Sequence, residues 1–302
     1  MKEKNHKGLP WFGIPKLIPY LRGYGRLFLS MVLFGLLASG MDVVIPLFQQ
    51  YAINHFIADS TMQGIWPFVA LYLLVMAVQT ASNYISAYGA CRAELYIGRD
   101  LRREAFDHVQ TLSFSYFNQN SVGYIHARVI SDTDRIAGTL AWGIMEGVWE
   151  IAYLLFAIVM MFALNWKLAL CVMVIVPILV VSSIFFQKKL VFYHRKVREH
   201  NSQITSAFNE GITGAKTTKT LVIEDKVEKE FDQLTGEMKR VSVRAMHFRS
   251  VFMSTTAFAA SIALAIVLWR GGIITREGVM LVGTLSVFMN YAQGMMEPIQ
   301  WL

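Results

Sequence analysis

Residues 90–138 read ACRAELYIGRDLRREAFDHVQTLSFSYFNQNSVGYIHARVISDTDRIAG, a long charged stretch between two apolar runs. A second charged stretch, residues 188–248, follows two further apolar runs. Both are far longer than the helix connections of compact domains, whose median is about four to six residues. We call them the first hairpin and the second hairpin, because each keeps helical spacing on both sides of a turn-rich centre.

The apolar runs predict a membrane protein. The chain is 55% hydrophobic and 16% charged, with mean hydropathy +0.42, whereas soluble domains are about 25% charged. A transmembrane helix needs about 20 mostly apolar residues. Six runs are long enough, the last being the most polar: residues 27–50, 65–89, 139–164, 167–190, 250–270 and 279–302. We predict an all-α membrane protein with six transmembrane helices over residues 27–302, preceded by an interfacial segment, residues 1–26.

The distribution of lysine and arginine predicts the orientation. Of the 28 such residues, 25 lie in the N-terminal segment, in the two hairpins or, for Arg249, directly after the second hairpin, and the others are Lys167, Arg270 and Arg276. Cytoplasmic segments carry this excess, so we expect a multi-pass protein of the plasma or inner membrane with a cytoplasmic N-terminus. The net charge of +7 then mostly reflects this topology. We expect the lipid bilayer as a partner and no nucleic acid.

Both hairpins have apolar stripes at helical spacing, so we expect the spans to continue as helical arms. An arm of about 20 residues projects roughly 30 Å. Opposite charges four residues apart, Arg103–Asp107 and Arg128–Asp132, support the same helices. The stripes are Leu101, Ala105, Val109 and Leu112 in the first hairpin and Val197, Ile204, Phe208 and Ile212 in the second.

The spacing falters at the centre of each hairpin. The first tip, residues 113–125, reads SFSYFNQNSVGYI, and the second tip, residues 209–225, reads NEGITGAKTTKTLVIED. The aromatic pair Tyr116 and Phe117 stands among polar turn residues. Exposed aromatic residues on a polar tip indicate a protein contact, the alternative being a small local core.

Together, six spans, two long hairpins and these two tips resemble the transmembrane domain of ABC exporters of the multidrug and lipid type. The first tip resembles the family's run of two aromatics, a Thr-Gly pair and an S-R-x-x-x-D motif, although Val122 replaces the threonine and Ala127 the serine. Asn54 stands where the family more often has an aspartate. Residues 209–231, which include the second tip, resemble the family's second cytoplasmic loop at Glu210, Gly214, Lys219, Glu224 and Phe231.

The resemblance implies that the tips are coupling helices, which fit into grooves of nucleotide-binding domains. ATP and Mg would bind on that partner domain, and a second transmembrane domain would complete a homodimer or heterodimer. The substrate would be an amphipathic small molecule, a lipid or a peptide. The implied residues are Tyr116, Phe117, Asn118, Gly123, Arg128 and Asp132 in the first coupling helix and Glu210, Gly214, Lys216, Lys219 and Leu221 in the second.

No catalytic or cofactor site is expected in the chain itself. The segment GITGAKTT, residues 211–218, contains glycine, lysine and threonine, as a phosphate loop does. A phosphate loop requires G-x-x-x-x-G-K-[ST] between a strand and a helix. Here Ala215 separates Gly214 from Lys216, and no strand is expected before the segment. No metal-ligand cluster is apparent either. The family's ATPase domain follows the sixth helix, in which this chain ends, so we expect that domain beyond Leu302 or on another chain.

Ionisable and amide side chains inside spans are costly and are usually functional or paired. We predict that some of them line a substrate cavity that favours cationic or amphipathic compounds. The candidates are Asp42, Asn83, Glu146, Glu150, Asn290 and Glu297. The alternative function is an ATP-independent channel or receptor-like protein whose hairpins bind a regulator; an intramembrane enzyme would need catalytic clusters that the sequence does not offer.

Overall fold

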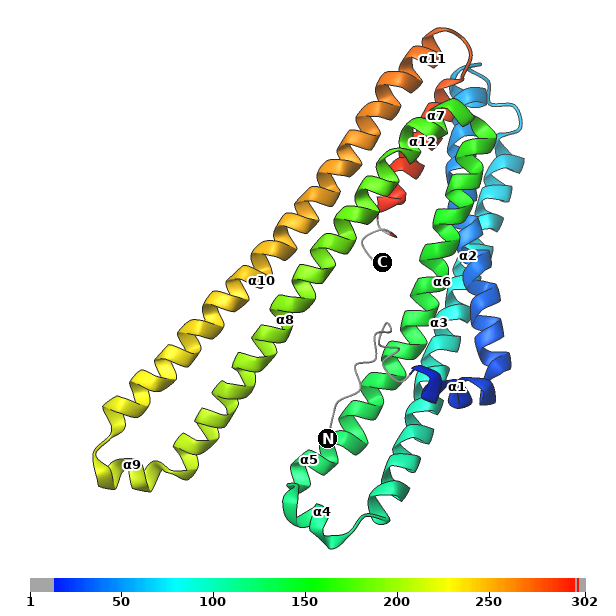
Figure 1. Cartoon of the computed structure of the whole chain (residues 1–302). Helices are drawn as coiled ribbons and strands as arrows, with labels where there is room; N and C mark the ends of the chain where they lie inside the picture. The colour runs from blue at the N-terminus through cyan, green and yellow to red at the C-terminus, as the bar shows by residue number, and fades with distance from the viewer. Residues whose placement is uncertain (1–13, 297, 299–302) are drawn as a thin grey trace. The chain divides into compact units, whose positions relative to one another are not determined.

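The computed structural model describes residues 14–296 and residue 298, and within them all regular structure is helical (Figure 1). Of the predicted site residues, Glu297 lies outside the described residues. The helices are α1 (Ile14–Gly23), α2 (Gly25–Tyr51), η1 (Ala52–Ile57), α3 (Ile65–Gln110), α4 (Phe114–Gln119), α5 (Val122–His126), η2 (Ala127–Asp132), α6 (Thr133–Leu164), α7 (Trp166–Met173), α8 (Ile175–Thr213), α9 (Ala215–Leu221), α10 (Glu224–Ile266), η3 (Val267–Gly271), α11 (Gly272–Arg276) and α12 (Val282–Gly294).

Five of the six predicted spans correspond to helices that are long and apolar enough to cross a membrane. These are Gly25–Ile57, Ile65–Gln110, Val122–Leu164, Trp166–Thr213 and Glu224–Arg276, the search covering the described residues. The all-α membrane fold is thereby confirmed. The sixth predicted span, residues 279–302, is represented by α12, which has 13 residues.

The chain divides into two compact units, which we describe separately. The first comprises residues 1–160 and Leu281–Val287, and the second Met161–Met280 and residues 288–302. In the first unit, α2 packs along α3 through small residues. The hydroxyl of Ser86 donates to the carbonyl of Met31 at 3.0 Å, and a Cβ on Gly89 would lie 3.3 Å from the Cβ of Met31. Small residues allow such close approach between membrane helices.

The first hairpin is the continuation of α3 beyond its apolar half. With 46 residues, α3 is about 69 Å long at 1.5 Å per residue, roughly twice the thickness of a bilayer's hydrocarbon core. The chain then turns through α4 and returns through α5, η2 and α6 (Figure 1). The predicted stripe of Leu101, Ala105, Val109 and Leu112 is half-buried on one face, as expected.

The second hairpin is formed by α8, with 39 residues, and α10, with 43. Aromatic rings join the two helices, with centroids 5.5 Å apart for Phe186 and Phe252 and 5.0 Å for Tyr193 and Phe248. The predicted stripe is only half right. Val197 and Ile204 are half-buried, whereas Phe208 and Ile212 are exposed. Near the tip, Ala207, Gly211 and Gly214 take the inward positions.

Candidate functional site: the hairpin tips and the polar clusters of the first unit

The first tip is a short helix held by local polar caps. Ser113 and Asn120 are extended at the two ends of α4, and the side-chain amide of Asn120 donates to the carbonyl of Tyr116 at 2.9 Å. The hydroxyl of Ser121 accepts from the backbone N–H of Tyr124 at 3.3 Å and caps α5. Asn120 therefore ends α4, and Ser121 begins α5. In the sequence, these residues indicated only a turn.

The first tip exposes large apolar side chains. The side chains of Phe114 and Val122 are 89% and 84% exposed, and Phe117 is also exposed. Tyr116 is half-buried, and its ring meets that of Phe117 edge-on at 5.8 Å. Sequence reasoning missed Phe114. The signal that could have marked it is its place directly after Ser113, because serine often precedes the first residue of a helix.

The base of the tip is polar on one side and apolar on the other. Arg128 donates to Asp132 at 2.6 Å, as the spacing predicted, and lies over the ring of Tyr124 at 4.9 Å. Asn118 and Gly123 are exposed, and space around Gly123 is open. An apolar hollow of about 340 Å³ is lined by Phe106, Val109, Phe117, Val122, Ile125, His126, Val129 and Ile130.

The second tip turns at Gly214, between α8 and α9. Its N–H donates to the carbonyl of Glu210 at 2.7 Å, and a Cβ at this position would lie 2.9 Å from that oxygen. After α9, Val222 adopts φ +53° and is 81% exposed. A β-branched residue is costly in this left-handed conformation, and such strain is concentrated at functional positions.

The remaining residues predicted for the second coupling helix are at the surface. Glu210, Lys216, Lys219 and Leu221 are exposed, and Gly214 is half-buried. Residues 211–213 and 215–218 are helical, in α8 and α9. A phosphate loop needs consecutive backbone N–H groups turned toward the anion, whereas here the N–H groups of Gly214 and Thr218 bond to Glu210 and Gly214. The segment therefore does not fit ATP.

The predicted cavity residues within the first unit differ in their surroundings. Asp42 accepts hydrogen bonds from the indole of Trp149, at 3.0 Å, and from the amide of Gln79, which ties α2, α3 and α6 together. The sequence reasoning missed Trp149, because no periodic pattern pairs an indole with a carboxylate on another helix. Glu150 is buried, at 8% exposure, but Glu146, one turn away, is exposed.

Asn83 and Asn290 complete the described members of the predicted cavity. Asn83 is exposed on α3, in the first unit. Asn290 is half-buried on α12 and belongs to the second unit. The structure thus assigns Asp42 a definite polar environment and leaves the grouping of the six residues a prediction.

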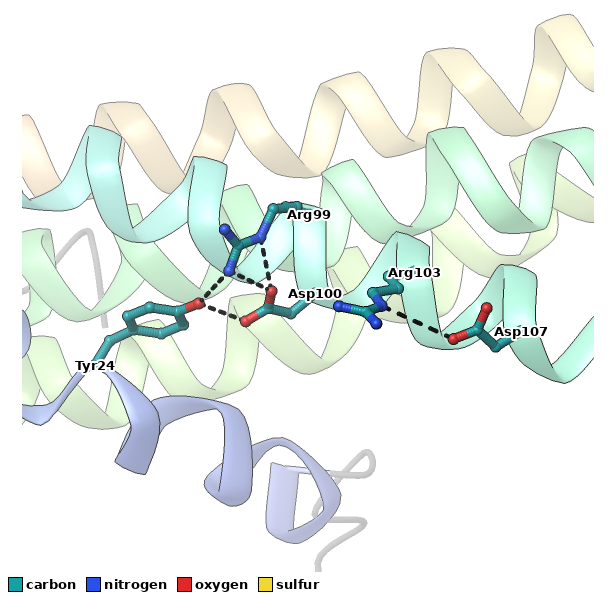
Figure 2. A network of polar contacts seen from close by, with 5 residues as sticks. All are labelled: Tyr24, Arg99, Asp100, Arg103 and Asp107. Carbon is teal, nitrogen blue, oxygen red and sulfur yellow. Dashed lines mark hydrogen bonds and ion pairs between the residues drawn. The ribbon is translucent and has the colours of Figure 1, made fainter.

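A polar network joins Tyr24, which lies between α1 and α2, to α3 (Figure 2). The hydroxyl of Tyr24 donates to Asp100 at 2.5 Å, and the guanidinium of Arg99 donates to the Tyr24 oxygen at 3.0 Å and to Asp100 at 2.9 Å. One turn earlier on α1, Tyr20 donates to Glu104.

Both tyrosines of this network hold their protons more firmly than a free tyrosine. Its hydrogen bond to Glu104, then burial and the nearby carboxylate charges, raise the pKa of Tyr20 to about 12. The hydrogen bond to Asp100 similarly raises the pKa of Tyr24. Ionisation of either phenol would place two negative charges side by side, so the contact requires the neutral tyrosine.

Two amide side chains join the far end of α2 to the start of α12. The Asn54 carbonyl oxygen accepts from the backbone N–H of Gly283 at 2.8 Å. The amide of Gln50 donates to the hydroxyl of Thr284 at the same distance. Asn54, noted in the sequence as an unusual residue, thus satisfies a free N–H in the first turn of α12.

Comparison with known proteins identifies a family model that matches most of the chain. The family described as ABC transporter transmembrane region matches residues 27–299. An ABC transporter ATP-binding protein of Bacillus subtilis, YknV, is 24% identical over 98% of this chain, and a candidate multidrug export ATP-binding/permease protein of Staphylococcus aureus is 24% identical over 94%. The matches cover 49% and 50% of those two proteins. The chain therefore spans about half the length of the curated relatives it matches.

Proposed function

Because the chain belongs to the ABC transporter transmembrane region family, we propose that it forms the substrate pathway of an ATP-driven exporter and couples that pathway to ATPase domains. Its partners are nucleotide-binding domains, which carry ATP and Mg, and a second transmembrane domain. Its location is the plasma or inner membrane, with the N-terminus and both hairpins in the cytoplasm.

The observation that carries the proposal is the shared construction of the two tips. Each hairpin ends in a helix of six or seven residues, α4 or α9, between two much longer helical runs. Each tip also exposes apolar side chains: Phe114, Phe117 and Val122 on the first and Ile212, Leu221 and Val222 on the second. Exposed apolar side chains at the end of a rigid arm favour docking onto another protein.

The long helices suit the transmission of movement. Because α3 runs without interruption from the apolar region to the first tip, a displacement of α4 is transferred along about 69 Å of helix. In the second hairpin, α8 and α10 are locked together by ring contacts at two levels. Each hairpin would therefore move as a lever when its partner domain moves.

The pathway itself would be lined by polar residues of the spans. Asp42 is the strongest candidate, because a carboxylate held between Trp149 and Gln79 offers a negative charge within an apolar bundle. Such a group favours amphipathic substrates that carry a cation. The other predicted residues Asn83, Glu146, Glu150, Asn290 and Glu297 remain proposals for the same pathway.

Replacing Phe114 and Phe117 by alanine in the assembled transporter tests the first tip. Aromatic anchors of protein interfaces contribute about 2 kcal/mol or more, so the ATPase domains should bind roughly 30-fold more weakly. Transport per ATP hydrolysed should fall in vesicles. Both substitutions are at exposed positions, so the hairpin itself should remain folded.

A matched control removes an equally exposed aromatic away from the tips. Phe258→Ala on α10 changes a side chain that is 68% exposed in the apolar part of the helix, and it should leave coupling unchanged. If the Phe114→Ala, Phe117→Ala protein couples transport to hydrolysis as well as this control does, α4 is not the docking element.

A further inference from the structure

The second hairpin carries a concentrated band of positive charge next to its apolar spans. Residues 188–199 and 237–249 contain nine lysines and arginines and two glutamates. Toward the tip, residues 200–236 contain four lysines and six acidic residues. The positive charge is therefore local. We define the basic belt as Lys188, Lys189, Arg195, Lys196, Arg198, Lys239, Arg240, Arg244 and Arg249.

The belt residues lie at matching levels on the two helices. Contacts between Phe186 and Phe252, Tyr193 and Phe248, and His200 and Glu237 fix the antiparallel register of α8 and α10. In this register, Lys188 and Lys189 lie level with Arg249. Arg195 and Lys196 lie near Arg244, and Arg198 lies near Arg240. The belt thus forms three successive basic levels on one helical pair.

These cations are not neutralised within the described part of the chain. None of the nine forms an ion pair there, although Glu199 and Glu237 lie in the same segments. Glu237 instead contacts His200 at 3.9 Å. In the first hairpin, by contrast, ion pairs join Arg99 to Asp100, Arg102 to Asp134, Arg103 to Asp107 and Arg128 to Asp132.

A hollow within the belt brings like charges together. It has a volume of about 490 Å³ and is lined by Gly236, Lys239, Arg240, Val243 and Arg244, without a carboxylate among them. Arg240 and Arg244 are four residues apart on α10, an arrangement that destabilises a helix unless an anion is shared between them. An anion from outside the hairpin can therefore bind here without competing with a carboxylate of the lining.

The position of the belt identifies the source of that anion. Counting from Ser250, where the apolar run begins, Arg244 lies about 9 Å and Lys239 about 16 Å away along the helix. The headgroup layer is about 5–8 Å thick on each side, and charges act over a further 8 Å or so at physiological salt. Arg249 and Arg244 therefore lie well within reach of lipid phosphates, and Lys239 lies at the limit of that reach.

Aromatic side chains at the same levels support a membrane boundary there. Phe192 is exposed, and the ammonium group of Lys196 lies 4.8 Å from its ring centre. An aromatic ring with a cation beside it is typical of the interfacial zone, where one part of the pair faces acyl chains and the other faces headgroups.

We propose that the basic belt of α8 and α10 binds the phosphate headgroups of anionic phospholipids in the leaflet that it borders. Bound lipid would hold the second hairpin at a fixed depth and neutralise charges that the protein leaves unpaired. The inference requires that α8 and α10 cross the bilayer, but not that the chain transports a substrate, so an effect on coupling is not part of its test.

The test measures lipid selectivity of the purified chain in phosphatidylcholine vesicles. Spin-labelled phosphatidylglycerol and spin-labelled phosphatidylcholine are compared by electron paramagnetic resonance, which counts the lipids immobilised by the protein. Each cation near an anionic surface contributes a factor of about five in affinity. Three such factors multiply to roughly 100-fold, so the variant Lys239→Gln, Arg240→Gln, Arg244→Gln should lose its preference for phosphatidylglycerol by about tenfold, if the contributions are partly additive, up to about 100-fold.

Two control variants separate position, charge and folding. Lys219→Gln, Lys226→Gln, Lys229→Gln removes the same charge from the tip region and should retain the preference. Lys239→Arg, Arg240→Lys, Arg244→Lys keeps the charges and should also retain it, which shows that the fold tolerates changes at these positions. Equal selectivity of the belt variant and the wild type would overturn the proposal.

Two further outcomes would also overturn it. If inorganic phosphate at matched ionic strength removes the preference more effectively than chloride, the belt binds soluble phosphate. If the preference disappears only when the chain self-associates, as judged by cross-linking, a second copy covers the belt. Displacement by both salts in proportion to ionic strength is the result expected for headgroup binding.

Discussion

Substitution of Gly283 by alanine should separate the far end of α2 from α12. An ideal Cβ at this position would lie 2.4 Å from the carbonyl oxygen of Gln50 and 2.7 Å from the side-chain oxygen of Asn54. Ordinary contacts of this kind begin near 3.4 Å, so the two helices must part by nearly 1 Å. Overpacking of this size costs about 1–3 kcal/mol.

The same displacement would weaken two hydrogen bonds. Both the Asn54–Gly283 and the Gln50–Thr284 bonds are 2.8 Å long, and each contributes about 1 kcal/mol. The free energy of unfolding should fall by roughly 2–4 kcal/mol in total, allowing for partial relaxation. The measurement is reversible unfolding in mixed micelles with increasing sodium dodecyl sulfate.

Gly143→Ala provides the matched control. Gly143 lies inside α6, and nothing approaches within 4 Å of the added Cβ, so the helix should become more stable by about 0.5–1 kcal/mol. If Gly283→Ala unfolds at the same detergent fraction as the wild type or at a higher one, α12 does not approach α2 as described, and the role assigned to Asn54 is refuted.

Three further predictions follow from strained or polar residues. Val222→Gly should relieve the left-handed strain at φ +53° and slow amide exchange at the second tip, while transport per ATP falls because an exposed apolar contact is lost. Tyr20→Phe should lower the free energy of unfolding below pH 10, because the hydrogen bond to Glu104 is lost. The difference from the wild type should vanish as the pH rises from 10 to 12. Over that interval the wild type itself loses the contact, because the pKa of Tyr20 is raised to about 12. Asp42→Asn should lower transport of cationic relative to neutral amphipathic compounds in vesicles; unchanged selectivity with reduced stability would assign Asp42, with Trp149, to holding the helices together.

The helical arms could be predicted from the sequence because their cores are local. In the first hairpin, Leu101, Ala105 and Val109 are half-buried on one face of α3, and Val109 lines a hollow together with Val129 and Ile130 of η2, so periodicity alone identifies the buried face. The same argument fails near the second tip. There Ala207, Gly211 and Gly214 line a hollow of about 540 Å³ together with residues of α9 and α10, whereas the larger side chains of Phe208 and Ile212 are exposed.

The polar clusters could be predicted only in part. Asp42 stood out because carboxylates are rare in apolar runs, but its partner Trp149 lies 107 positions away in the sequence. Which side chains meet across helices depends on how α2, α3 and α6 are rotated about their axes. Sequence spacing fixes the face on which a residue lies, and not the neighbour that the face meets.

Sequence spacing also predicts ion pairs that the structure does not form. Spacing predicts ion pairs wherever acids and bases stand four residues apart, and the first hairpin forms both of the pairs predicted for it. Arg195 and Glu199 have that spacing too, yet no ion pair joins them. An exposed pair of this kind contributes only about 0.3–0.5 kcal/mol, whereas an anionic membrane surface offers each cation about 1 kcal/mol. The unpaired state of the basic belt is therefore the lower in free energy wherever anionic headgroups are present, and the positive charge of the second hairpin serves adhesion to the membrane as well as orientation within it.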